Sequence, residues 1–209
     1  MKFFSVFIVF LLFLSCNEVA NSPTNVDTLR KNDSNIATGN NLANPFAGTD
    51  LSPLDIIYFP ADYPVLKMSR KVDALPVARV IYSRPHKQGR KIFGTLIPYN
   101  EPWRLGANEG TEIELFEPVT IQGKKIATGR YILYCIPQKE QWSIIFNTNI
   151  YSWGLKQDPS KDVHRFQIPI QKATRSFEYF TMSFEKAQPG AILFMSWDDV
   201  TAQLPITIQ

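Results

Sequence analysis

The sequence predicts an all-β protein, with a single antiparallel β-sandwich or jelly-roll-like domain and few or no long helices. From residue 54 onward, short runs rich in Val, Ile, Tyr, Phe and Thr alternate with Gly, Pro, Asn and Asp, which is typical of strands joined by turns. The chain also contains 15 prolines, and each removes a backbone donor and restricts φ. No stretch after residue 54 keeps a helical apolar period for three turns, so long helices are not expected.

Ten segments are expected to form the strands. In one of them Ile113 and Leu115 share a face while two glutamates share the other, as in a half-buried strand. Gly123 lies between two apolar runs and predicts a tight hairpin turn, because glycine adopts positive φ without strain. The predicted strands are residues 55–59, 77–83, 111–116, 119–122, 129–136, 142–147, 164–170, 177–186, 191–197 and 202–208.

Residues 1–15 are expected to be a lipoprotein signal peptide. Lys2 is followed by the uncharged residues 3–14, which are too few to span a membrane and match the apolar core of an export signal. The string Phe13-Leu14-Ser15-Cys16 is similar to a bacterial lipobox, in which Cys16 is the lipidated residue. We therefore expect an exported protein held by a lipid anchor in the cell envelope, with the outer membrane preferred. An ordinary cleaved signal with an incidental cysteine is the alternative.

Residues 16–52 are expected to form a lipidated, flexible tether. This region is rich in Asn, Ser, Thr, Ala, Gly and Asp and has few large apolar residues, so it cannot bury enough surface to offset the entropy of ordering. The β-sandwich domain is expected to occupy residues 53–209.

Charge and cysteine content exclude several classes of function. The net charge is +3, from 22 basic and 19 acidic residues without a basic stripe, so no nucleic-acid partner is expected. Apart from Cys16 the chain has only Cys135, which lies in an apolar run and is expected in the core, without a disulfide. His86 and His164 are the only imidazoles and are not spaced as a ligand pair, so we expect no metal and no cofactor.

One segment, residues 82–111, does not have the pattern of a strand and a short turn. It concentrates planar guanidinium groups with carboxylates, an amide and amphipathic aromatics, which suit recognition of a carboxylate, phosphate or sugar. A static network that ties a long connection to the sandwich is the competing interpretation. The candidate ligand-binding residues are Arg84, Arg90, Tyr99, Trp103, Arg104, Asn108 and Glu109.

The same segment resembles a known family. Tyr82-Ser83-Arg84-Pro85 and above all Trp103-Arg104-Leu105-Gly106-Ala107-Asn108-Glu109 resemble DUF2911, an uncharacterised bacterial envelope family of unknown function that is common in Bacteroidota. The resemblance continues through Trp142-Ser143-Ile144-Ile145-Phe146-Asn147 to Trp197 and covers residues 75–208. It implies an envelope location but no activity, because none is assigned to the family.

The favoured function is a binding module for a glycan, a peptide, a small anion or a partner protein. Tyr99, Trp103 and Trp153 could offer flat apolar faces to a ligand. Trp142 and Trp197 lie in apolar strands and are expected in the core, whereas Trp153 lies in a loop and is the better surface candidate.

Two alternatives remain open. A hydrolase-like enzyme would use Glu101 and Glu109 with Arg104, and it would need the two carboxylates across one cleft. The other alternative is a purely structural envelope component, in which the same side chains only hold the loop.

Overall fold

The computed structural model describes residues 51–208. The expected signal peptide, the expected lipidation site Cys16 and residues 16–50 of the expected tether lie outside the described residues. Within residues 51–208, no helix combines the length and the apolar character needed to cross a membrane.

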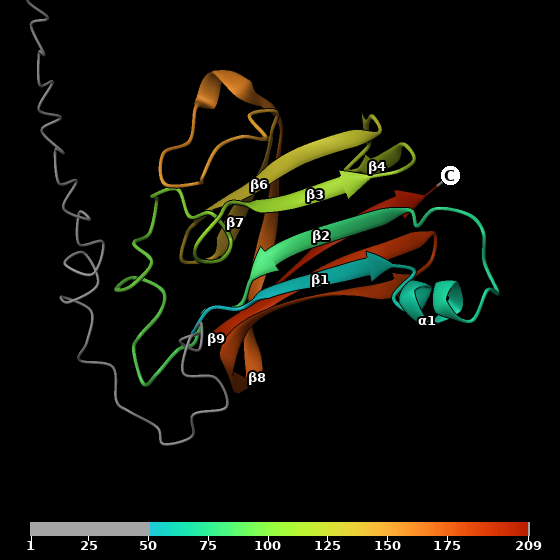
Figure 1. The fold of residues 1–209 in the computed structure, drawn as a ribbon. Helices are drawn as coiled ribbons and strands as arrows, with labels where there is room; N and C mark the ends of the chain where they lie inside the picture. Colours follow the sequence, from blue (N-terminus) through green and yellow to red (C-terminus); the bar gives the residue numbers. More distant parts are fainter. Residues whose placement is uncertain (1–50, 209) are drawn as a thin grey trace, which may run out of the picture. The chain divides into compact units, whose positions relative to one another are not determined.

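Within this range the strands form one antiparallel sheet of nine strands, in the order β1-β2-β3-β6-β7-β8-β9-β4-β5 (Figure 1). The only α-helix here is the six-residue α1, and a short 3-10 turn precedes β8. The elements are β1 Leu54–Phe59, α1 Tyr63–Met68, β2 Ala78–Ser83, β3 Thr111–Leu115, β4 Val119–Ile121, β5 Lys124–Ile126, β6 Gly129–Pro137, β7 Gln141–Asn147, β8 Asp162–Ala187 and β9 Gly190–Ile208.

The long strand β8 joins the two layers of this sheet. Its first part pairs with β7, where Ile144 lies opposite Phe166, and its last part pairs with β9, where Met182 lies opposite Met195. The sheet therefore folds over, and β8 and β9 pass behind β1 and β2 in Figure 1. One buried core contains side chains of both layers, including Ile113 of β3 and Leu193 of β9. The predicted all-β, sandwich-like fold is confirmed.

Tryptophans occupy the centre of this core. Trp142 is 0% exposed and Trp197 is 2% exposed, as their apolar strands predicted. Trp103 packs against both of them, with ring centroids 5.8 Å from Trp142 and 5.9 Å from Trp197. Cys135 is fully buried, as predicted, and burial raises the pKa of its thiol.

Two pairs of predicted strands are single long strands in the structure. Residues 164–170 and 177–186 both belong to β8, and the polar residues between them form an irregular stretch where the pairing with β9 shifts register. Residues 191–197 and 202–208 both belong to β9. The interval between them begins at Asp198, whose φ is +54°. Polar residues at a β-bulge look like a loop in the sequence although the strand continues through them.

Tight turns depend on glycine at two positions. Gln122 and Gly123 both have positive φ and connect β4 to β5, which confirms the predicted hairpin turn. Gly190 begins β9 with a φ of +136°. A Cβ at Gly190 would overlap the carbonyl oxygen of Ile206, whereas a Cβ at Gly123 would meet no atom within 4 Å.

We predict that Gly190→Ala destabilises the domain more than Gly123→Ala. Both changes place a side chain at positive φ, which costs about 1 kcal/mol, but only Gly190→Ala also displaces backbone. Urea unfolding of the two variants measures the difference. Equal losses would mean that the contact between Gly190 and Ile206 relaxes without cost.

Candidate functional site

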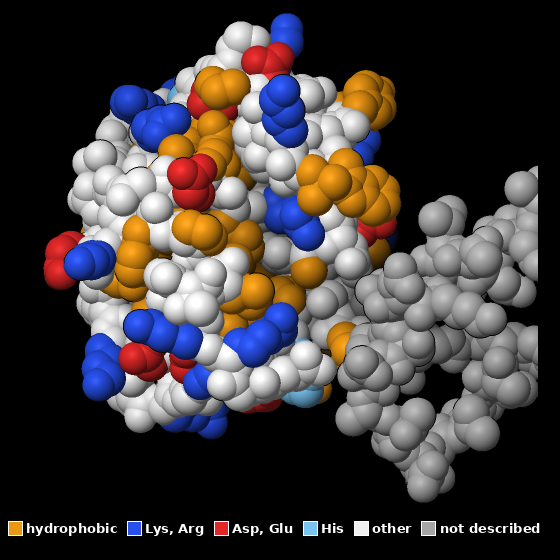
Figure 2. Space-filling view, turned by 90° about the vertical axis from the view of Figure 1, so that its left-hand side faces the viewer, with side chains coloured by type: hydrophobic (Ala, Val, Ile, Leu, Met, Phe, Trp, Pro, Cys, Tyr) orange, Lys and Arg blue, Asp and Glu red, His pale blue; other side chains and the backbone are white. Residues whose placement is uncertain are grey.

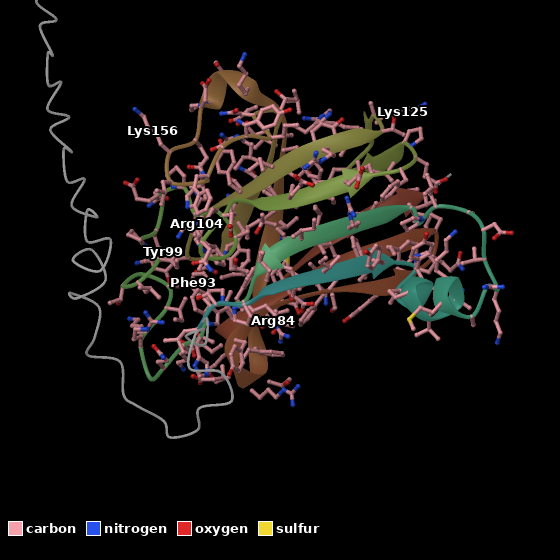
Figure 3. The ribbon with its side chains drawn as sticks, in the orientation of Figure 1. Arg84, Phe93, Tyr99, Arg104, Lys125 and Lys156 are labelled. Atoms are coloured by element: carbon pink, nitrogen blue, oxygen red, sulfur yellow. The ribbon has the colours of Figure 1, made fainter. Side chains whose placement is uncertain are left out.

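The candidate site is built on the connection between β2 and β3, residues 84–110, at one end of the sandwich (Figures 1 and 3). Its first residues are bound to β8. The Phe180 N–H donates to the carbonyl of Pro85 over 3.0 Å, and the Lys87 N–H donates to the carbonyl of Glu178 over 2.7 Å. The His86 ring stacks on Tyr179, with centroids 4.2 Å apart. The connection is therefore fixed where it leaves the sheet.

An ion pair also binds the start of the connection to β9. The Lys87 ammonium forms an ion pair with Asp198 and donates to Ser176 Oγ at 3.0 Å. Burial raises the pKa of Asp198, but hydrogen bonds from Lys87 and Ser176 more than offset this effect and leave the pKa below its ordinary value. The same hydrogen bond, seen from the other partner, raises the pKa of Lys87 above its ordinary value. Both groups are therefore charged at neutral pH.

Trp103 fixes the far part of the connection. Its backbone pairs with Cys135 of β6 through two hydrogen bonds of 2.7 and 2.8 Å, and its indole Nε1 donates to the carbonyl of Gly106 over 3.1 Å. Its side chain is only 6% exposed. Trp103 is therefore mainly a core residue, with little of its surface open to a ligand.

Two of the predicted arginines hold chain segments in place. Arg84 lies 3.4 Å from the Asp55 carboxylate and its guanidinium lies 5.8 Å from the Tyr179 ring centre. Arg90 donates from Nε and Nη2 to the carbonyls of Lys87 and His86 in its own loop. These contacts agree with a static network in this part of the connection.

The remaining predicted residues lie apart from one another. Tyr99 is half-buried beside Gly94 and packs against the core. Asn108 donates to the carbonyl of Ser52 over 3.2 Å. Glu109 is exposed and lines a different hollow from Arg90 and Arg104, while the exposed Glu101 lines neither of these two hollows.

The structure does bring Arg90, Trp103 and Arg104 together. They line a hollow of about 320 Å³, which we call the arginine hollow. Figure 2 shows this side of the domain, where Lys and Arg side chains stand among apolar ones. Within the described chain, the lining consists of Ser52, Pro85, Arg90, Leu96, Ile97, Trp103, Arg104, Gly106, Ala107 and Trp197.

Arg104 differs from Arg84, which forms an ion pair, and from Arg90, whose guanidinium donates to backbone carbonyls. Its side chain makes neither kind of contact with any residue between 51 and 208. Its Nε is buried and has no hydrogen-bond partner in this range, and burial lowers the pKa of its guanidinium. Trp197 Nε1 is a second buried donor without a partner in the same range. The Nε atoms of Arg79 and Arg84 are also buried without a partner, but both of those guanidinium groups form ion pairs. Arg104 has no ion pair in this range, so the hollow that its side chain lines can take an anionic acceptor.

Sequence reasoning did not include Trp197 in the site. Its apolar strand predicted burial, which is correct, but alternation along a strand cannot show that the ring also lines a hollow. The small residues Gly106 and Ala107 also line this hollow. In residues 51–208, no three His, Cys, Asp or Glu side chains gather in a group that could hold a metal.

We predict that Arg104→Met leaves the domain as stable as before or stabilises it by up to about 1 kcal/mol, because it removes a buried donor without a partner and keeps the apolar stem. Arg79→Met is the matched control. The Nε of Arg79 is likewise buried without a partner, but its guanidinium forms an ion pair with Glu114, so losing this arginine should lower stability. Thermal unfolding compares the two variants. A melting temperature lowered by several degrees in Arg104→Met would show that Arg104 is architectural.

The comparisons with known proteins place this chain in a family. No curated protein and no solved structure matches it. A family model described as a protein of unknown function, DUF2911, matches residues 64–206. This range includes β2 to β8, most of β9 and the whole arginine hollow except Ser52. The resemblance seen in the motif around Trp103 is thereby confirmed, and the chain belongs to the DUF2911 family.

Proposed function

We propose that this protein is a lipid-anchored binding module of the cell envelope whose domain takes a small, anion-bearing ligand in the arginine hollow. The observation that carries the proposal is Arg104, a partly buried guanidinium that lines the hollow without an anionic partner in the described part of the chain. A carboxylate or phosphate would compensate for the hydration that this group has lost.

Arg90 supports the same ligand class. Two of its guanidinium nitrogens are bound to backbone carbonyls, so the plane of the group is fixed before any ligand arrives. Fixed donors bind more tightly because little side-chain entropy is lost on binding. The described lining of the hollow includes Arg90 and Arg104 but no Asp or Glu, so its potential favours an anion.

The apolar lining defines the rest of the ligand. Leu96, Ile97, Trp103 and Trp197 face the same hollow, whose volume of about 320 Å³ is at the small end of the range for ligand sites. A flat apolar body that carries one carboxylate or phosphate fits this combination. A peptide C-terminus with an aromatic side chain is one such molecule.

The alternatives receive less support. The hydrolase hypothesis needs Glu101 and Glu109 across one cleft. Of the two hollows described here among residues 51–208, Glu109 lines one and Glu101 lines neither. The structural hypothesis accounts for Arg84 and in part for Arg90, but it leaves Arg104 unexplained. The envelope location and the lipid on Cys16 rest on the N-terminal sequence alone.

Calorimetric titration of the full-length protein in mild detergent tests the proposal. The probes are benzoate and phenyl phosphate, with benzyl alcohol as the neutral counterpart. We expect at least one anion to bind and Arg104→Gln to weaken it by about tenfold or more, because a charge-assisted contact is lost.

Lys125→Gln is the control for this titration. It removes the same charge from β5, at the opposite end of the domain from the arginine hollow (Figure 3), and should leave the affinity unchanged. If neither anion binds at about 10 mM, or if benzyl alcohol binds equally well, the arginine hollow is not an anion site.

A further inference from the structure

A second hollow lies beside the connection between β7 and β8. Two aromatic side chains of this connection line it while remaining open to solvent: Tyr151 is 92% exposed and Trp153 is 57% exposed. The hollow has a volume of about 360 Å³. We call it the aromatic hollow. Exposed aromatics that line a concave surface are a common feature of ligand-binding sites.

The connection that carries these aromatics is held by its own hydrogen bonds. The Asn147 side chain donates to the carbonyl of Asp158 over 2.9 Å and accepts from the Asn149 N–H over 2.8 Å. Within the connection, the Gly154 N–H donates to Ser152 Oγ over 3.2 Å. The two rings therefore stand on a preorganised loop, which lowers the entropy lost on binding.

Glycine allows this loop to touch the segment that carries Arg104. Gly154 has a φ of +85°, and a Cβ there would lie 2.9 Å from the Gly110 Cα and 3.1 Å from the Arg104 Cβ. The loop thus packs directly against residues 104–110, and this contact places Tyr151 and Trp153 beside Glu109 in one hollow.

Polar groups also line the aromatic hollow. Arg130 of β6 forms a bidentate pair with Glu112 of β3, at 2.9 and 2.6 Å. The exposed Glu109 is a third charged residue in the lining. A carboxylate has acceptor positions beyond those that the arginine uses, so adjacent carboxylates and a guanidinium can accept from and donate to neighbouring hydroxyl groups.

We propose that the aromatic hollow binds a neutral sugar. A pyranose ring would lie with its C–H face on Tyr151 or Trp153, and its hydroxyls would bond Glu109, Glu112 and Arg130. The two carboxylates outnumber the single guanidinium, so the hollow disfavours the anions that suit the arginine hollow. This site is independent of the proposed function, because the two hollows share no described residue.

Calorimetric titration of the full-length protein in mild detergent with three neutral trisaccharides, cellotriose, maltotriose and triacetylchitotriose, tests this inference. We expect at least one to bind, and Trp153→Ala and Tyr151→Ala to weaken it, the stronger effect being about tenfold or more because a stacking face is lost. Glu109→Gln should weaken the same sugar without altering the fold, because Glu109 is exposed.

Two control variants show whether sugar binding depends on the aromatic hollow itself. Leu155→Ala removes an apolar side chain that is 72% exposed on the same loop but does not line the hollow, and it should leave sugar binding unchanged. Arg104→Gln, which changes the arginine hollow, should also leave sugar binding unchanged. A failure of the sugar proposal is therefore distinguishable from a failure of the anion proposal.

The proposal is overturned if no trisaccharide binds at about 10 mM, or if Leu155→Ala weakens binding as much as Trp153→Ala. It is also overturned if sedimentation shows a dimer that Trp153→Ala dissociates, because the aromatics would then form a protein interface.

Discussion

The packing of Trp103 against Trp142 and Trp197 is the interaction on which the candidate site depends. Trp142 belongs to β7 and Trp197 to β9, so the indole of Trp103 contacts both parts of the folded sheet at once. The backbone pairing with Cys135 aligns the chain on β6. Arg104 is thereby directed to a hollow by a residue that is itself almost fully buried. Rigid support of this kind is what allows a loop residue to act as a binding group.

The strands were predictable because their alternation is local. Ile113 and Leu115 alternate with polar residues, and this alternation predicted the face of β3 that is buried. Trp142 and Trp197 lie in apolar runs, which predicted their burial. The continuity of β8 was not predictable, because polar residues at a bulge have the composition of a loop. Local pattern therefore determines which residues are extended, while pairing with a distant strand determines where an extended segment ends.

The candidate site was predictable as a segment but not as a set of contacts. Arg84, Arg90 and Arg104 look equivalent in sequence, yet one pairs with Asp55, one binds its own loop, and one has no partner among the described residues. The partner of Arg84 lies far away in the chain, in β1, and the backbone carbonyls that Arg90 binds depend on how its loop folds, so the sequence alone does not reveal either contact. Glu109, expected beside Arg104, instead shares a hollow with Tyr151 and Trp153, because Gly154 lets another loop approach.

The contact between Gly110 and Gly154 also has a mechanical consequence. Because no side chain separates these two segments, neither can move toward the other without displacing backbone, and the Cβ of Arg104 lies at the same junction. The spacing of the two loops is therefore set by backbone against backbone, so side-chain changes elsewhere in either loop leave it as it is. The pair of glycines acts as a fixed spacer between two surfaces that otherwise share no residue.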